Sequence, residues 1–212
     1  MIYFLVRGRM GKVSYRRMST ATGPQNCQTA WPKDALRISF GVIWAIDAAL
    51  KWLPGFRSMF MGTIMGEADG QPRWLHPWFT FWIHIQHPRV NFFVDLVAVV
   101  ETLIAIALIL GFARKITYIS AALFSLVVWA TAEGFGGPYT VGASDIGTAI
   151  IYAVVFLNLL AISYYAGPAR YSVDFILERR ISWWWKVAEL RRPETPQLVD
   201  DRVSEKQVPQ PA

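Results

Sequence analysis

Long apolar segments alternate with short polar or glycine-rich breaks along most of the chain. Four of them stand out, at residues 36–53, 90–112, 116–132 and 146–165. Each approaches the roughly 20 residues that an α-helix needs to cross the hydrocarbon core of a bilayer. Breaks such as Pro54-Gly55 and Gly167-Pro168 fall at segment ends, where a helix buried in lipid can stop without losing internal hydrogen bonds. The pattern predicts an all-α fold, an integral membrane four-helix bundle.

Polar segments flank and divide this membrane domain, which we place at residues 35–168. Residues 1–34 are basic and are predicted to be a disordered cytoplasmic tail, although an organellar transit peptide would have a similar composition. Residues 54–89 form an aromatic loop expected at the outer interface. Residues 169–192 are predicted to be an amphipathic helix on the inner leaflet, and residues 193–212, rich in Pro, Gln and charge, to be disordered.

The distribution of Lys and Arg orients the bundle. The N-terminal tail, the Arg114-Lys115 loop and the segment from Arg170 onward are basic, whereas the loop from Pro138 to Ser144 has no basic residue. Cytoplasmic loops carry the excess of positive charge. The chain is therefore predicted to be a multi-pass protein of the cell membrane with both termini cytoplasmic, in contact with the lipid bilayer.

Composition agrees with a membrane protein and excludes several chemistries. The chain has 10 Trp, 8 Tyr and 13 Phe and only 17% charged residues, against roughly a quarter in soluble domains. Its net charge of +6 lies in tails and one loop rather than on one face, which argues against nucleic-acid binding. Cys27 is the only cysteine, so no iron–sulfur or dithiol site is available within the chain.

Histidines also argue against cofactor binding within the spans. No His lies in any of the four apolar segments, so the chain lacks the facing axial ligands of a haem bundle. His84 and His87 are spaced to share a helical face, but packing among the loop aromatics is the simpler interpretation. No haem, iron–sulfur or flavin site is visible, and no metal site is predicted.

Charged residues inside the apolar segments are the main candidates for function. Asp47 and Lys51 lie in the first span, and Asp95 and Glu101 in the second. Such groups cost roughly 2.5–3.5 kcal/mol each to insert into a membrane, so each is a candidate for a functional role. Asp47 and Lys51 are four residues apart and are expected to pair, and interhelical contacts would account for Asp95 as well. Glu101 falls near the bilayer midplane, where a carboxyl group can relay a proton or hydrogen-bond a quinone carbonyl.

A glycine-rich stretch at the outer end is the other candidate. It comprises Glu133 to Thr140, with Gly134, Gly136, Gly137, Pro138 and Tyr139, followed by Asp145 to Thr148. One interpretation is a surface turn in which Asp145 caps the fourth helix. The other is a loop that closes over a ligand between Glu133 and Tyr139.

These residues carry a resemblance to a known family. The runs Glu101 to Gly111, Trp129 to Pro138 and Asp145 to Thr148, with Leu53 to Phe56, resemble the DoxX/DoxD family in order and spacing. The resemblance implies a four-helix prokaryotic membrane protein, similar to the small, DoxD-type subunit of thiosulfate:quinone oxidoreductase. It places Glu101, Glu133, Asp145 and the glycines among them in the family motif.

We therefore expect a membrane subunit of a quinone-linked sulfur or thiol oxidoreductase, with bound quinone and a partner subunit or homo-oligomer. The expected catalytic residues are Glu101, Asp47 and Glu133, and the expected substrate- or quinone-binding residues are Lys51, Asp95, Trp129, Tyr139 and Asp145. A non-enzymatic anchor or assembly subunit is the alternative. A small transporter, coupled to protons through the buried carboxylates, is a third possibility and would require an oligomer.

Overall fold

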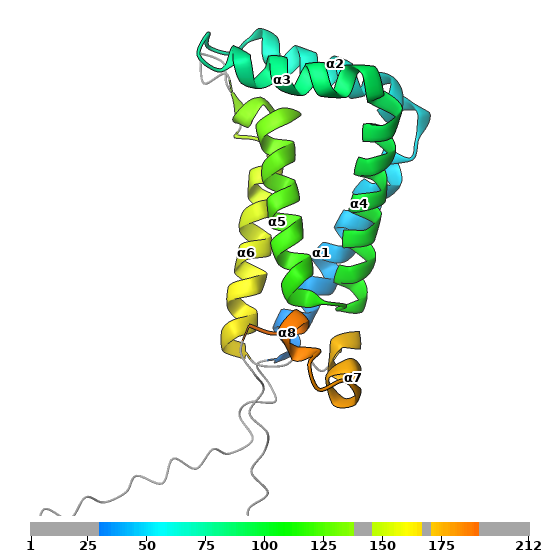
Figure 1. Ribbon diagram of the computed structural model, residues 1–212. Helices are drawn as coiled ribbons and strands as arrows, with labels where there is room; N and C mark the ends of the chain where they lie inside the picture. Colours follow the sequence, from blue (N-terminus) through cyan, green and yellow to red (C-terminus); the bar gives the residue numbers. More distant parts are fainter. Residues whose placement is uncertain (1–29, 138–145, 167–170, 191–212) are drawn as a thin grey trace, which may run out of the picture.

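The structure of the chain, a computed structural model, describes residues 30–137, 146–166 and 171–190 (Figure 1). Within these ranges it is all-α, as predicted, and contains no strand. The helices are α1 (Ala30–Lys51), α2 (Pro54–Asp69), α3 (His76–Gln86), η2 (His87–Arg89), α4 (Val90–Leu110), α5 (Arg114–Thr131), η3 (Gly134–Gly136), α6 (Thr148–Ala166), α7 (Val173–Arg180) and α8 (Trp185–Ala188).

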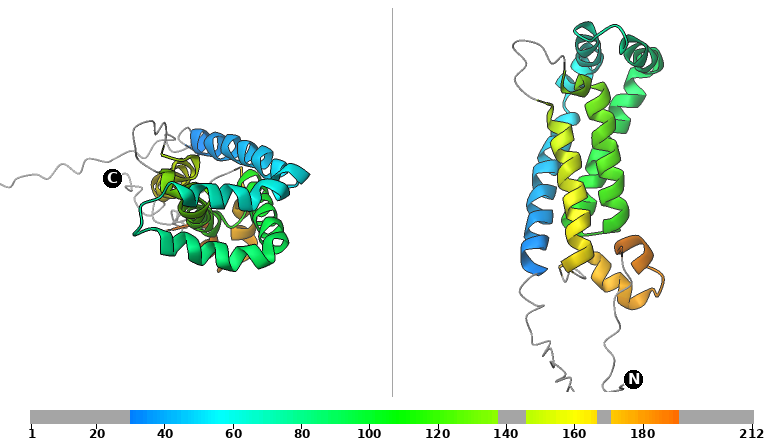
Figure 2. Two further views of the ribbon diagram at one scale, coloured as in Figure 1. Left: turned by 90° about the horizontal axis from the view of Figure 1, so that it is seen from above. Right: turned by 90° about the vertical axis from the view of Figure 1, so that its left-hand side faces the viewer.

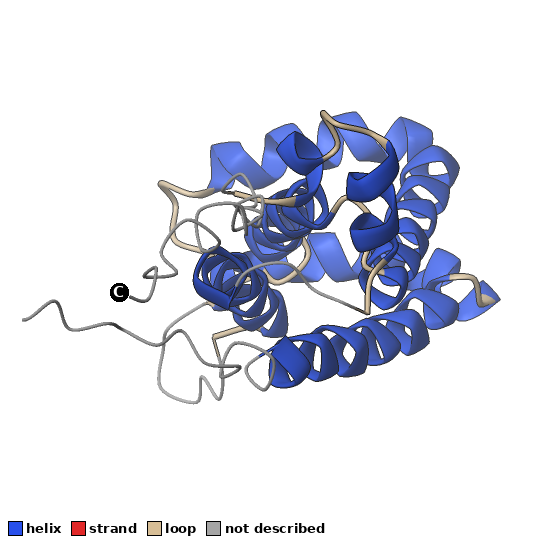
Figure 3. Cartoon of the chain, turned by 90° about the horizontal axis from the view of Figure 1, so that it is seen from below, coloured by secondary structure: helices blue, strands red, loops and turns tan. Residues whose placement is uncertain are grey.

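Four long helices run side by side, and short helices lie across both of their ends (Figures 1 and 2). Helix α1 packs chiefly on α4, and α5 on α6. Close approach of α1 to α4 depends on Gly41, because a Cβ atom there would lie 3.0 Å from Leu108 Cβ. Helices α2 and α3 cross one end, whereas α7 and α8 lie at the other. Seen along the bundle, α5 and α6 are nearly end-on, whereas α1 runs obliquely to them (Figure 2, left). Figure 3 shows the same arrangement from below.

Aromatic rings fill the contact between α1 and α6. Phe40 and Trp44 of α1 meet Tyr152 and Phe156 of α6 in edge-to-face contacts, with ring centroids 5.1 to 5.7 Å apart. This geometry suits the ring quadrupoles and contributes about 0.5–1.5 kcal/mol per pair beyond burial. The cluster joins the two helix pairs into one bundle.

The outward faces of the long helices are apolar. Large exposed side chains include Ile43, Ile46 and Leu50 of α1, Leu103 and Ile106 of α4, Leu123 and Val127 of α5, and Ile151, Val154 and Leu157 of α6. Two helical stretches, His76–Leu110 and Thr148–Tyr165, are long and apolar enough to cross a membrane.

Residues 54–69 and 76–89 are helical, whereas a connecting loop was expected over residues 54–89. Pro54 stands at the start of α2 and Pro77 in the first turn of α3, positions where proline starts a helix because the missing N–H has no intrahelical partner anyway. The two helices bury Phe60, Ile64 and Phe79 against the outer end of the bundle. They form a cover rather than a loop.

Both ends of the helical bundle also differ from prediction. Helix α1 begins at Ala30, so residues 30–34 are not part of a disordered tail. The single amphipathic helix expected over residues 169–192 is wrong, because the chain breaks between α7 and α8. The break lets Asp174 and Glu189 both reach Arg114. Residues 1–29, 167–170 and 191–212 lie outside the described part of the chain.

Candidate functional site

Three charged side chains meet where the outer end of α1 lies against α4. Lys51 Nζ lies 3.2 Å from both carboxylate oxygens of Asp47, the pair expected from their spacing. It also lies 3.9 Å from Oε2 of Glu101, which is too long for a hydrogen bond. Glu101 is only 4% exposed, and its buried Oε2 has no hydrogen-bond partner. The structure thus brings Asp47, Lys51 and Glu101 into one polar group, called the outer triad below.

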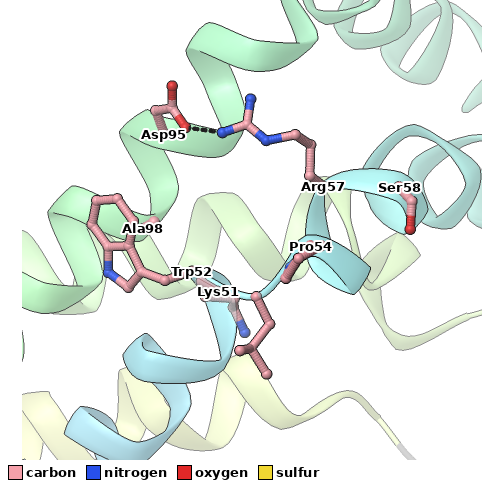
Figure 4. Close-up of a pocket in the computed structure, with 8 residues that line it drawn as sticks. Lys51, Trp52, Pro54, Arg57, Ser58, Asp95 and Ala98 are labelled. Carbon is pink, nitrogen blue, oxygen red and sulfur yellow. Dashed lines mark hydrogen bonds and ion pairs between the residues drawn. The ribbon is translucent and has the colours of Figure 1, made fainter.

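Beside the outer triad is an open pocket of about 330 Å³ between the α1–α2 turn and α4 (Figure 4). Lys51 lines it and so connects it to Glu101. Trp52 and Arg57 flank it, and Ala98 of α4 also lines it. The pocket lies at the low end of the volumes found for small-molecule sites, roughly 300–1,000 Å³.

The Asp95 side chain lies on a different face of α4 from the Glu101 side chain. It is more than half exposed and forms an ion pair with Arg57, which also donates a 2.8 Å hydrogen bond to Asn91 Oδ1. Six residues place two side chains about 120° apart around a helix. Asp95 therefore lies at the rim of the pocket and not in the outer triad.

Glu133 and Trp129 lie in a second group that secures the start of α6. Both oxygens of Glu133 accept the backbone N–H of Ala149, at 3.2 and 2.9 Å. The Trp129 indole donates to the Ile146 carbonyl at 2.7 Å. A carboxylate at a helix N-terminus satisfies a free N–H group and favours the helix dipole. This geometry gives Glu133 a structural task, apart from the outer triad.

The glycines beside Glu133 are required by backbone conformation. Gly134, Phe135 and Gly136 all have positive φ angles, of 52°, 60° and 73°. A Cβ atom on Gly136 would overlap the carbonyl group of Ile146. The Gly134 carbonyl accepts a 3.0 Å hydrogen bond from Gln71, which follows α2. The turn thus ties α5, α6 and the α2–α3 cover together, while Gly137 is extended. Pro138, Tyr139 and Asp145 lie outside the described residues.

A second charged group, called the inner cluster below, lies at the α7–α8 end of the bundle and was not anticipated from the sequence. Arg114, at the start of α5, pairs with Asp174 at 3.0 Å, Glu189 at 2.5 Å and Glu178 at 3.5 Å. Asp174 is fully buried and also accepts the backbone N–H groups of Ala113 and Arg114. This inner cluster holds α7 and α8 against the α4–α5 turn.

Two further features belong to the inner cluster. Arg37 of α1 is buried and donates to the carbonyls of Leu108 and Ile109 at the end of α4, and to Tyr171 at 2.6 Å. Burial, followed by the nearby Glu189 carboxylate, raises the pKa of Glu178 to about 7.

The residue types were visible in the sequence, but Arg114 and its partners are 60 or more residues apart, so no local spacing revealed their pairing.

Comparisons with known proteins add no identification. No protein-family model, no curated protein and no solved structure matches the chain. The resemblance to the DoxX/DoxD family stays a prediction. Within the described residues no three His, Cys, Asp or Glu side chains are grouped to hold a metal ion.

Proposed function

We propose that α1, α4, α5 and α6 each cross the cell membrane, with both termini in the cytoplasm. These helices contain 22, 21, 18 and 19 residues, or about 27–33 Å at 1.5 Å per residue, close to the hydrocarbon thickness. Their exposed apolar faces would contact lipid. Basic residues such as Lys115, Arg179 and Lys186 lie at the α7–α8 end, which the positive-inside rule assigns to the cytoplasm.

We further propose that the protein is the membrane subunit of a quinone-linked sulfur or thiol oxidoreductase, similar to the DoxD-type subunit of thiosulfate:quinone oxidoreductase. The observation that carries this proposal is the buried, unpartnered Glu101 oxygen beside Lys51, which lines a pocket. An ionisable group at this depth is expensive unless it has a task. The arrangement fits a quinone head group, which supplies an acceptor for two electrons and two protons.

The outer triad can hold and move a proton. Lys51 is the member that lines the pocket, so its ammonium group can donate a hydrogen bond to a ligand oxygen there. Asp47 holds the ammonium group from the adjacent turn of α1. Glu101, behind Lys51 and shielded from solvent, is placed to return a proton to Lys51 after transfer. Asp47 and Glu101 thus keep this role from the sequence prediction, whereas Glu133 does not join them.

Electrons would come from a partner subunit. Cys27 is the only cysteine, so the chain cannot cycle a dithiol by itself. The cations nearest the pocket, Lys51 and Arg57, are each paired with carboxylates, which disfavours a thiosulfate dianion there. We place oxidation of the sulfur compound on the partner and reaction with quinone on this chain.

Substitution Glu101→Gln tests the proposal. It keeps the side-chain size but removes the ionisable carboxyl group, so quinone reduction by the purified complex with thiosulfate or a thiol donor should fall about 100-fold or more. Asp69→Asn, which changes an exposed carboxylate on α2, is the matched control and should keep full activity. Unchanged turnover in Glu101→Gln would remove this residue from the mechanism.

A specific observation also supports the alternative, an anchor or assembly subunit. Ile176 and Trp183 are 57% and 54% exposed on the α7–α8 segment, near Arg179 and Arg180. This surface suits a cytoplasmic protein partner, since aromatic and Arg residues are enriched at interfaces. Loss of a co-purifying partner in Ile176→Ala/Trp183→Ala, but not in Glu101→Gln, would favour the anchor.

A further inference from the structure

We propose that the pocket between the α1–α2 turn and α4 is a lateral binding site for a lipid-soluble ring compound that carries an oxygen acceptor. Such a ligand would enter from the apolar side of the bundle rather than through its outer end. This inference rests on the proposed quinone-linked function, and it names the route and the contacts of the ligand.

Among the described residues, α2 and α3 cover the end of the bundle above the outer triad. Phe60 and Ile64 of α2 pack with Val94 of α4 in a buried apolar cluster, and Phe79 of α3 is 1% exposed. The Gln71–Gly134 hydrogen bond ties this cover to the turn that follows α5. A ligand that approached along the bundle axis would have to displace the packed side chains of the α2–α3 cover.

The side of the bundle is open at the same depth. Trp52 and Leu53 are 56% and 54% exposed, and Leu103, on α4, is 60% exposed. Trp52 and Leu53 line the pocket, so its rim is continuous with the apolar surface that would face lipid. A hydrophobic molecule dissolved in the bilayer can therefore reach Lys51 without crossing water.

Two walls of the pocket are held rigidly by hydrogen bonds. The Trp52 indole donates to Thr102 Oγ1 at 3.1 Å, and Thr102 donates in turn to the Ala98 carbonyl at 2.7 Å. On another side of the pocket, Arg57 donates to Asn91 and is paired with Asp95 (Figure 4). Ala98, which also lines the pocket, presents only a methyl group. A flat ring fits between an indole face and a guanidinium group, both of which favour stacking.

The chemistry of the lining selects the class of ligand. The lining combines the apolar side chains of Trp52, Leu53, Pro54 and Ala98 with the polar side chains of Lys51, Arg57, Ser58 and Asp95. Lys51 and Arg57 are already paired with carboxylates, so a neutral ligand with a carbonyl or hydroxyl oxygen is favoured over an anion. The pocket volume of about 330 Å³ suits one ring with its substituents, while a tail would remain in the bilayer.

Equilibrium binding of a benzoquinone with one isoprene unit to the purified full chain in lipid nanodiscs tests the site. Trp52→Ala removes one wall, and Ser58→Trp fills the pocket from α2 at an exposed position. Each should raise Kd at least tenfold. Trp74→Ala, at a residue 77% exposed and outside the pocket lining, is the matched control and should leave Kd unchanged.

Separate outcomes distinguish the site from the enzyme. No binding to the native chain, or an unchanged Kd in both Trp52→Ala and Ser58→Trp, would overturn the lateral site even if quinone reduction is observed. Pocket-dependent binding, without quinone reduction by the purified complex with any sulfur or thiol donor, would support the site and remove the proposed oxidoreductase function. If Trp52→Ala fails to fold, Ser58→Trp alone decides, because it adds a side chain without removing a bond to α4.

Discussion

Lys51 and Arg114 show how single cations organise charge at the two ends of the bundle. Lys51 lies near two carboxylates, Asp47 and Glu101, and Arg114 near three in the inner cluster. Removing one partner of a buried pair leaves the other uncompensated and costs about 3–5 kcal/mol. The two groups differ in accessibility, because Lys51 lines a pocket whereas Arg114 is enclosed by protein. Only the outer triad is therefore open to a ligand.

Glu133 offers a prediction at this scale. Glu133→Ala removes the acceptor for the Ala149 N–H group and should lower the free energy of unfolding by about 1 kcal/mol, as for other lost caps. Glu133→Gln, which keeps an acceptor oxygen, should lose less. Thermal unfolding in detergent measures both, with Asp69→Asn as the control. Full stability combined with lost quinone reduction would instead make Glu133 part of the reaction.

At the level of the helices, the α7–α8 segment should respond to pH. Glu178 lies near Arg114, Asp174, Glu189 and Lys33, and burial raises its pKa to about 7. A carboxyl group whose pKa is higher when docked than when released binds a proton more tightly in the docked state. Docking should therefore be strongest near pH 4.5–5 and weaken as pH rises through 7. The pKa of Glu189 is also raised, chiefly by burial, and it acts in the same direction.

Hydrogen exchange of residues 171–190 in the purified protein measures this effect. Exchange should be slower at pH 5.5 than at pH 8 after correction for the intrinsic rate, and Glu178→Gln should reduce the difference. Glu67→Gln, on α2 at the other end of the molecule, is the matched control and should leave the difference as it is. Protection that increases with pH would contradict the assignment.

The sequence located α4, α5 and α6 to within two residues of their observed ends, because apolar length and glycine or proline breaks are local signals. Helix α1 begins six residues before the predicted start at residue 36. It failed for α2 and α3, since Pro54 was interpreted as a break and residues 54–89 as a loop, although Pro54 and Pro77 lie at the starts of helices. The Asp47–Lys51 pair followed from four-residue spacing. The contact of Lys51 with Glu101 did not, because the register of α1 on α4 depends on packing at Gly41. For the same reason the sequence placed Glu133 with Glu101, although Glu133 caps α6.

The two ends of the molecule differ, with α2 and α3 at one end and the basic α7–α8 segment at the other, and this difference predicts the orientation of the protein in a membrane. In a Cys27→Ser background, Arg180→Cys and Gly70→Cys place single exposed thiols at opposite ends. A membrane-impermeant maleimide should label Gly70→Cys in intact cells but label Arg180→Cys only after permeabilisation. The reverse labelling would contradict the proposed orientation, and equal labelling of both in intact cells would contradict membrane insertion.

The Arg37 guanidinium group has a consequence for biogenesis. It lies on the first helix, yet its acceptors are the end of α4 and the Tyr171 carbonyl beyond α6. A ribosome makes Arg37 more than 130 residues before Tyr171. The Arg37 side chain therefore cannot form all of its hydrogen bonds until residue 171 has been synthesised. During translation the Arg37 guanidinium group therefore lacks its acceptor at Tyr171. Insertion of α1 thus precedes the final packing of its Arg37 side chain.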